Sequence, residues 1–472
     1  MTTRRLHPFL PLALAVIVVA CGTSSATPSA TPPAVTATSV PATSAPTAAP
    51  TLTPIPTPTP QSADDWPLYH LDAQRTGFAP NFPALSGPLS EAWARSLDGA
   101  VYAEPLVVHG RVIAATEGDS VYALDPNTGA VIWSKNLGTP VPLSTLPCGD
   151  IDPLGITGTP AYDPATNTIF AVAEVTGPHH ILFALDPSGG AILWSRNVDL
   201  PGDDPRTHQQ RPALAVGNGY VYIGFGGLAG DCGQYTGKIV GVPTSGQGDT
   251  ISYRVPVARE GAVWATGGPV MDAGGNLYIS TGNGSSSSTY DGSDSVVELS
   301  PALKQLSLFA PSEWAADNDG DLDLGSLSPV LVPGGFVFIA GKRGTGYILN
   351  QGNLGGIGKQ VSSASVCAAF GGAAQDGSTI YVPCRTQLRQ IKIGTDGSIN
   401  AGWTYSGAGG PPVIGGGAVW TLTGSTLYAL DPASGKELAG ISVGTLPHFA
   451  SPTLWRGQVF VGTMTGVIAI TA

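Results

Sequence analysis

The chain has 472 residues, of which 64 are glycine, 42 are proline and only 11% are charged. Its 21 lysines and arginines against 33 aspartates and glutamates give a formal net charge of −12. Without a basic stripe, this charge argues against nucleic-acid binding, which requires a positive surface. Short apolar runs separated by glycine and proline, with no long helical period, favour one large all-β domain.

The first 20 residues have the features of an export signal. Arg4 and Arg5 precede an apolar core at 10–20, which is too short to span a membrane. The segment ends in Val-Val-Ala before Cys21, which resembles the cleavage motif of bacterial lipoproteins. That resemblance implies that Cys21 becomes the first mature residue and carries a lipid. The alternative is an ordinary signal peptide that happens to end near a cysteine.

Residues 21–63 follow the signal and are predicted to be a disordered tether. From residue 22 onward this stretch consists mainly of Thr, Ser, Ala and Pro and has no charged or aromatic residue. Such a composition buries too little apolar surface to fold, and its prolines stiffen the chain. We therefore expect three parts: a signal at 1–20, a lipidated tether at 21–63 and a folded domain at 64–472.

One phrase recurs within the folded domain and indicates its architecture. It reads VYALDPNTGAVIW at 121–133, LFALDPSGGAILW at 182–194 and LYALDPASGKEL at 427–438. Each copy contains two apolar runs of strand length joined by an Asp-Pro-x-x-Gly turn. A unit this small cannot bury its own faces, so its recurrence predicts blades that share a core.

The domain divides into eight such units, at 102–138, 155–199, 211–256, 261–311, 324–365, 370–407, 409–444 and 449–472. The last unit has sequence for only three strands. Residues 89–97 look like the missing Trp-bearing outer strand, which would close the ring and remove its free edges. The sequence thus predicts an eight-bladed β-propeller of four-stranded antiparallel blades, closed by an N-terminal strand. Seven blades is the alternative.

Four cysteines lie within the folded domain: Cys148, Cys232, Cys367 and Cys384. An even number in an exported chain predicts two disulfides, with three possible pairings. A hairpin turn at 375–378 would place Cys384 opposite Ala369 and diagonal to Cys367, close enough to bridge. This geometry favours Cys367–Cys384 and leaves Cys148 to pair with Cys232.

The repeated phrases resemble those of the quinoprotein (PQQ-like) β-propeller superfamily, over about residues 65–472. The segments WPLYH at 66–70 and QRTG at 74–77 also resemble the entry segment of that superfamily. The resemblance implies one of two functional branches. One contains quinone-dependent alcohol and sugar dehydrogenases, and the other contains non-catalytic propeller lipoproteins that serve as assembly scaffolds in the outer membrane.

Three residues match cofactor-binding positions of the dehydrogenase branch. The resemblance implies that Trp264 would form the floor beneath the quinone, that Asn283 would bind calcium, and that Lys342 would hold the cofactor. The alternative is that all three are ordinary parts of a blade, because inner-strand tryptophans and glycine turns also belong to the repeat itself.

Other dehydrogenase features are absent from the sequence. Ser300 stands where the catalytic Asp is expected, and serine is not a base at neutral pH without a partner. Leu228 and Ala229 stand where the calcium-binding Glu is expected, with Asp231 as the nearest carboxylate, and no two cysteines are adjacent. These gaps favour the non-catalytic branch.

Several polar segments have no clear place in the repeat. The acidic run at 317–323 resembles a calcium loop but lacks its downstream Glu, which favours a solvated loop. His179, His180 and His208 are expected to be ordinary loop residues. Long connections at 139–156 and 199–211 lie between blades, where binding residues concentrate, and Arg211 and Trp314 are predicted to line an axial pocket.

Together these features predict a membrane-anchored, extracytoplasmic β-propeller lipoprotein that acts as a non-catalytic binding or scaffold module. Its expected partners are the membrane, through the lipid on Cys21, and an envelope protein or glycan; a monomer is expected. This function requires no cofactor. The alternative is a PQQ-dependent alcohol or sugar dehydrogenase, which would bind PQQ with calcium.

Overall fold

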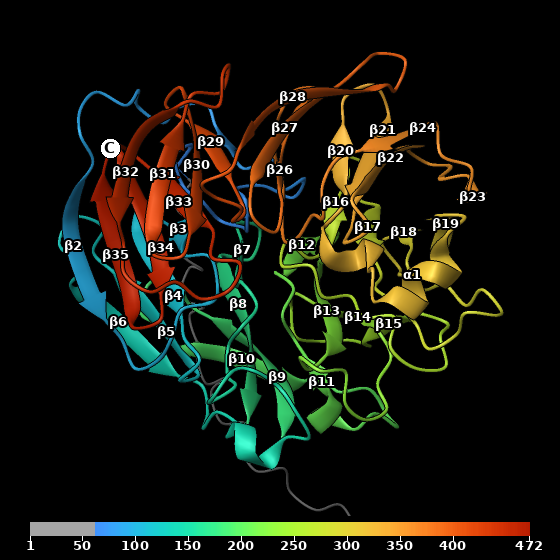
Figure 1. The fold of residues 1–472 in the computed structure, drawn as a ribbon. Helices are drawn as coiled ribbons and strands as arrows, with labels where there is room; N and C mark the ends of the chain where they lie inside the picture. Colours follow the sequence, from blue (N-terminus) through green and yellow to red (C-terminus); the bar gives the residue numbers. More distant parts are fainter. Residues whose placement is uncertain (1–61) are drawn as a thin grey trace, which may run out of the picture. The chain divides into compact units, whose positions relative to one another are not determined.

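The computed structural model describes residues 62–472, which contain eight β-sheets (Figure 1). The predicted signal at 1–20, the lipidation site Cys21 and residues 21–61 of the tether lie outside the described residues. Within the described part, no helix is long and apolar enough to cross a membrane.

The first four blades follow one another along the chain as antiparallel sheets. Blade one consists of β3 (Leu106–Val108), β4 (Arg111–Ala115), β5 (Ser120–Leu124) and β6 (Val131–Asn136). Blade two consists of β7 (Ala161–Asp163), β8 (Thr168–Val175), β9 (His179–Leu185) and β10 (Ile192–Asn197). Blade three consists of β12 (Ala215–Gly217), β13 (Tyr220–Gly227), β14 (Lys238–Pro243) and β15 (Ile251–Arg254), and β11 (His208–Gln209) also pairs with β13. Blade four consists of β16 (Val270–Met271), β17 (Leu277–Ser280), β18 (Val296–Leu299) and β19 (Gln305–Ala310).

The other four blades repeat this arrangement. Blade five consists of β20 (Val330–Val332), β21 (Phe336–Ala340), β22 (Thr345–Asn350) and β24 (Ser362–Ser365). Blade six consists of β25 (Ala374–Asp376), β26 (Thr379–Pro383), β27 (Leu388–Ile393) and β28 (Ile399–Tyr405). Blade seven consists of β29 (Val413–Gly415), β30 (Ala418–Thr423), β31 (Thr426–Leu430) and β32 (Glu437–Ser442). Two short strands add parallel pairs, β1 (Phe78–Ala79) on β29 and β23 (Gly356–Ile357) on β19.

The eighth blade joins the two ends of the domain. Its strands β33 (Pro452–Trp455), β34 (Gln458–Thr463) and β35 (Gly466–Thr471) are completed by β2 (Ser90–Ser96). The register of β2 on β35 runs antiparallel from Ser90 opposite Thr471 to Ser96 opposite Gly466, and Figure 1 shows the two strands side by side. The predicted eight blades and their closure by the segment at 89–97 are therefore confirmed.

The repeated Asp-Pro-x-x-Gly turn attaches each blade that carries it to the blade before it. The indole Nε1 of Trp93 in blade eight donates to the Pro126 carbonyl in the turn of blade one, at 2.8 Å. Trp133 donates in the same way to Pro187 at 3.0 Å, and Trp403 to Pro432 at 2.9 Å. The outer-strand tryptophan and the following turn thus form one inter-blade contact.

Residues 66–77, the predicted entry segment, run between the blades at the centre of the ring. The first strands of neighbouring blades contact one another, so they form the inner wall. The entry segment bonds to seven blades at or beside these strands, through Val107, Tyr162, Leu214, Met271, Gln375, Ile414 and Ser451. Because these partners come from blades all around the ring, the segment lies across the ring axis.

The acidic run at 317–323 is not the solvated loop that the sequence predicts. Its first part belongs to α1 (Trp314–Gly320), and the Asp317 carboxylate is buried and pairs with Arg343. Asp323, at its end, is also buried. Of the three 3₁₀ turns, η1 (Leu143–Thr145) and η2 (Pro205–Thr207) lie in the long connections between blades, and η3 (Leu324–Ser326) follows Asp323.

Both predicted disulfides are present. Cys148 bonds Cys232 with a Cα–Cα distance of 6.0 Å, and Cys367 bonds Cys384 with a Cα–Cα distance of 5.8 Å. Cys384 forms a β-bridge with Ala369, as the hairpin register predicts. The first disulfide connects the loop that follows blade one to the β13–β14 connection within blade three, and the second lies within one hairpin.

Candidate functional site

A cavity of about 420 Å³ lies where connections from several blades meet. Four of the predicted site residues line it: Arg211, Trp264, Asn283 and Lys342. Each comes from a connection rather than a strand interior, between β11 and β12, β15 and β16, β17 and β18, and β21 and β22 respectively. We call this space the axial cavity.

The fifth predicted residue, Trp314, lies elsewhere. It is the first residue of α1 and is not among the residues that line the axial cavity. Its indole packs edge-on against the Tyr290 ring, with 5.3 Å between the ring centroids.

Lys342 and Asp323 form the charged part of one cavity wall. The Lys342 Nζ lies 2.5 Å from Asp323 Oδ2 and 2.7 Å from Asp321 Oδ1, and 5.7 Å from the centre of the Trp264 ring. Burial alone would lower the pKa of Lys342, but the carboxylates of Asp323 and Asp321 outweigh it and raise that pKa. Lys342 is therefore a charged but already paired cation.

Asp323 is a functional candidate that the sequence reasoning missed. Its Oδ1 accepts a hydrogen bond of 2.7 Å from the Asn283 backbone N–H, and burial raises its pKa although Lys342 opposes this. A Cβ on Gly282 would lie 2.2 Å from Asp323 Oδ1, so glycine is needed for this close approach. Its partners Asn283 and Lys342 are distant in the sequence, so no pattern around Asp323 marked it.

Ser300, where the sequence comparison expected a base, does not line the axial cavity. It lies in the turn between β18 and β19, where its hydroxyl accepts from the Lys304 backbone N–H at 3.2 Å. The buried carboxylate that lines the cavity comes from Asp323 instead.

Arg211, like Arg385, lines the cavity without an acidic partner among the described residues. Its guanidinium carbon lies 4.9 Å from the centre of the Phe449 ring, and no carboxylate of the described residues lies within 4.0 Å of it. Burial lowers its pKa, because the charged form loses hydration. An anion entering the cavity would restore that lost stabilisation.

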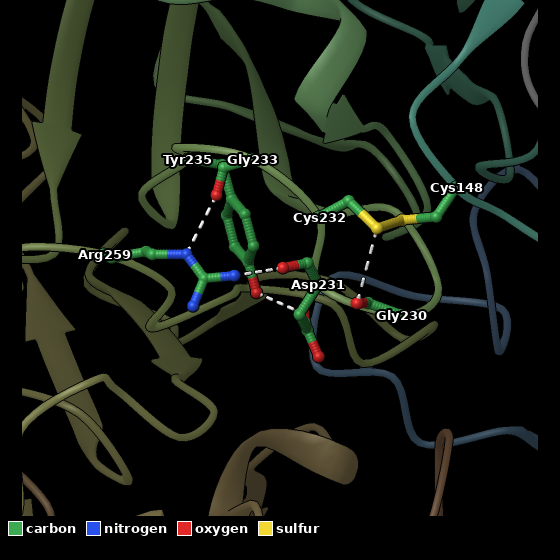
Figure 2. Close-up of a disulfide and its surroundings, with 7 residues drawn as sticks. All are labelled: Cys148, Gly230, Asp231, Cys232, Gly233, Tyr235 and Arg259. Atoms are coloured by element: carbon green, nitrogen blue, oxygen red, sulfur yellow. Dashed lines mark hydrogen bonds between the residues drawn. A yellow bond between two sulfur atoms is a disulfide. The ribbon is translucent and has the colours of Figure 1, made fainter.

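The wall where the sequence comparison expected a calcium-binding Glu is apolar and tightly held. Leu228 and Ala229 line it, and Asp231, the nearest carboxylate, accepts a 2.5 Å hydrogen bond from Tyr235 Oη. Figure 2 shows this pair beside the Cys148–Cys232 disulfide, with Arg259 donating to the backbone carbonyls of Asp231 and Gly233. In residues 62–472 no three His, Cys, Asp or Glu side chains are arranged to hold a metal ion.

The histidines differ from their prediction as ordinary loop residues. His179 is half-exposed, but His180 and His208 are buried in β9 and β11. His180 lies between Glu174 and Asp199, at 3.2 Å and 2.8 Å. Burial opposes its charge, but the two carboxylates raise its pKa to about 9. These structural ion pairs join β9 to the neighbouring strand β8 and to the connection that follows β10.

Comparison with known proteins gives one family and two kinds of relative. The model of the family described as outer membrane protein assembly factor BamB matches residues 90–353. A polyvinylalcohol dehydrogenase from a Pseudomonas species is 24% identical over 262 residues, which cover 50% of this chain and 38% of that protein. The chain thus matches well under half the length of that relative.

Similar solved structures include both dehydrogenases and a BamB protein. The quinohemoprotein alcohol dehydrogenase of Comamonas testosteroni has a TM-score of 0.67 at 18% identity, covering 86% of this chain and 80% of that one. A europium-containing methanol dehydrogenase has a TM-score of 0.65 at 15% identity, covering 87% of this chain and 98% of that one. BamB from Moraxella catarrhalis has a TM-score of 0.56 at 14% identity, covering 81% of this chain and 99% of that one. At these identities the likeness concerns the fold alone.

Proposed function

The chain belongs to the PQQ-like β-propeller family described as outer membrane protein assembly factor BamB, and we propose that it is a non-catalytic binding module. The family and the two disulfides indicate an extracytoplasmic location, because disulfides persist in oxidising compartments. We further propose that a lipid on Cys21 anchors the module to a membrane. The ligand of the module is a planar, anionic group bound in the axial cavity.

The observation that carries this proposal is the unpaired guanidinium of Arg211 in a cavity with aromatic walls. A cavity of about 420 Å³ is within the range of small-ligand sites. Trp264 and Phe449 offer ring faces to a flat group, with 6.3 Å between their centroids. An anion on Arg211 would gain a charge-assisted hydrogen bond without breaking an existing ion pair. An envelope protein or glycan that carries such a group would meet these requirements.

The cofactor of the dehydrogenase branch fits this cavity only in part. PQQ is flat and carries carboxylates, which suits Trp264 and Arg211. Its calcium lacks a carboxylate cage, because no three His, Cys, Asp or Glu side chains among the described residues are arranged to hold a metal ion. Lys342 is also already neutralised by two carboxylates. We therefore derive no reaction through this cofactor.

A second candidate function, a PQQ-dependent alcohol or sugar dehydrogenase, is favoured by Asp323. This carboxylate is buried, has a raised pKa and shares the cavity wall with Trp264 and Lys342. A general base needs those properties to accept a substrate proton near neutral pH. Both of its oxygens are engaged, however, by the Asn283 amide and the Lys342 ammonium.

Titration of the purified protein with PQQ, with and without calcium, separates the two functions. The binding module predicts saturable PQQ binding that does not need calcium, that weakens about tenfold in Arg211→Gln, and that supports no dye reduction with alcohols or sugars. Dye reduction that Asp323→Asn abolishes would establish the dehydrogenase instead. Absence of PQQ binding in the wild-type protein would overturn both.

A further inference from the structure

A second cavity, of about 710 Å³, adjoins the axial cavity and has a different lining. Its walls are mostly apolar, from Leu422, Leu446 and Pro447 together with the rings of Phe370 and Phe449. Phe370, Arg385, His448 and Phe449 line both cavities, so the two spaces are neighbours. We call this second space the blade-seven cavity, because Leu422 and Thr423 at the end of β30 in that blade line it.

Arg385 provides the charge at the edge of this cavity. Its guanidinium carbon lies 5.5 Å from the centre of the Phe370 ring. Among residues 62–472 it has no carboxylate within 4.0 Å, and only its backbone N–H takes part in a hydrogen bond. Two other arginines of blades five and six are engaged: Arg343 pairs with Asp317, and Arg389 donates to the Val366 carbonyl at 2.7 Å. Arg385 therefore has all of its side-chain donors available to a ligand.

The ring and the cation are held together before any ligand arrives. The Phe370 N–H donates to the Pro383 carbonyl, and the Arg385 N–H donates to the Ala368 carbonyl, each at 3.0 Å. The Cys367–Cys384 disulfide joins the same two backbone segments. A site fixed in this way loses little conformational entropy on binding, which favours affinity.

Phe449 supplies the opposite aromatic wall from an unusual backbone conformation. Its φ is +62°, in the left-handed region that bulky residues rarely adopt. Such outliers concentrate at ligand sites, where the surrounding structure enforces them. The Phe449 ring lies nearly parallel to that of Phe370, with 6.3 Å between centroids and 23° between planes. The two rings thus offer near-parallel faces at the boundary of the cavity.

We propose that the blade-seven cavity binds an aromatic carboxylic acid. The carboxylate bonds the guanidinium of Arg385, and the aromatic body packs on Phe370 and Phe449 against Leu422 and Leu446. The charge requirement follows from the unpaired guanidinium, and the aromatic requirement follows from the two ring faces and the aliphatic floor. This site shares the Phe449 ring with the axial cavity, but its charge comes from Arg385 rather than Arg211, and it does not depend on the proposed function.

The test uses two probes of nearly equal size, 2-naphthoate and the uncharged 2-naphthamide, titrated calorimetrically into the full chain. We expect naphthoate to bind at least about tenfold more tightly, because only its charged oxygens form an ion pair with Arg385. Arg385→Gln removes this difference and leaves the affinity for naphthamide unchanged. Arg456→Gln is the matched control, since Arg456 also lies over a ring, that of Trp455 at 5.0 Å, but does not line the cavity.

Two further variants locate the probe. Phe370→Ala weakens both probes, whereas Trp264→Ala, at a residue that lines the axial cavity but not the blade-seven cavity, weakens neither. Equal affinity of the wild-type protein for the two probes would overturn the proposal. A preference for naphthoate that persists in Arg385→Gln would also overturn it. A preference that Trp264→Ala abolishes would overturn it as well, because the acid would then bind in the axial cavity.

Discussion

Trp133 of blade one packs against the backbone of Gly190 in blade two. A Cβ on Gly190 would lie 2.5 Å from the Trp133 ring carbon Cε3, and Gly190 has a φ of +71°. The same indole donates to Pro187 of that turn. The Pro and Gly of the repeated turn therefore form the surface on which the tryptophan of the preceding blade packs.

The first prediction concerns this contact. Gly190→Ala adds a methyl group that clashes with the indole and strains the backbone, so we expect the free energy of unfolding to fall by about 2–4 kcal/mol. Urea denaturation measures this change. The neighbouring Gly189→Ala is the control, since nothing lies within 4 Å of its Cβ position and its φ is not in the left-handed region. Equal decreases in the free energy of unfolding for the two variants would contradict a stabilising role of the Trp133 contact.

The second prediction concerns the pH dependence of stability. Burial raises the pKa of Glu117 to about 8, well above its value in the unfolded chain. The folded protein then binds the extra proton, so this carboxyl stabilises the fold fully below about pH 4 and loses that effect as the pH rises through about 8.

Glu117→Gln keeps the side chain neutral, so the variant should be more stable than the wild type by about 2 kcal/mol at pH 9 and nearly unchanged at pH 5. Thermal unfolding at the two pH values measures the difference. The exposed Glu91 of β2 provides the control substitution Glu91→Gln. A Glu117→Gln effect that is the same at both pH values would refute the titration of this group.

The third prediction compares the two disulfides. The Cys148–Cys232 bond closes a loop with a sequence separation of 84, and the Cys367–Cys384 bond one of 17. Loop-closure entropy grows with loop length, so replacing the first pair with alanine should cost about 1–2 kcal/mol more than replacing the second. Guanidinium denaturation of the two double variants tests this order, and the reverse order would count against it.

The fourth prediction concerns the anchor. If Cys21 carries a lipid, Cys21→Ser should release the protein from membranes into the soluble fraction after cell lysis and ultracentrifugation. Cys148→Ser with Cys232→Ser serves as a cysteine control that should stay with the membranes. Wild-type and Cys21→Ser proteins that sediment equally would place the anchor elsewhere.

The eight-bladed ring could be predicted because the sequence patterns that indicate it are local. Each Asp-Pro-x-x-Gly turn lies between the two strands that it joins, and the tryptophan of residues 89–97 marks that segment as an outer strand. Both disulfides followed from one hairpin. The convergence of Trp264, Asn283 and Lys342 on one cavity was suggested by family resemblance, whereas their roles stay predictions.

Other features depend on contacts between distant segments and had no local signal. The burial of His180 is made possible by Glu174 on the neighbouring strand and by Asp199 in the following connection, so its sequence neighbours did not reveal it. Asp317 looked solvated because it stands in an acidic run, but Arg343, far along the chain, pairs with it. Asp323 was missed for a similar reason, since its partners Asn283 and Lys342 come from blades four and five.

The entry segment at 66–77 has a consequence for how the protein matures. Its hydrogen-bond partners range from Val107 to Ser451, so the last of them emerges only when almost the whole polypeptide has been delivered. Contacts this distant in sequence make assembly slow. The early blades therefore lack part of their hydrogen bonding to the entry segment until the late blades are present. During that interval they need protection from aggregation and proteolysis.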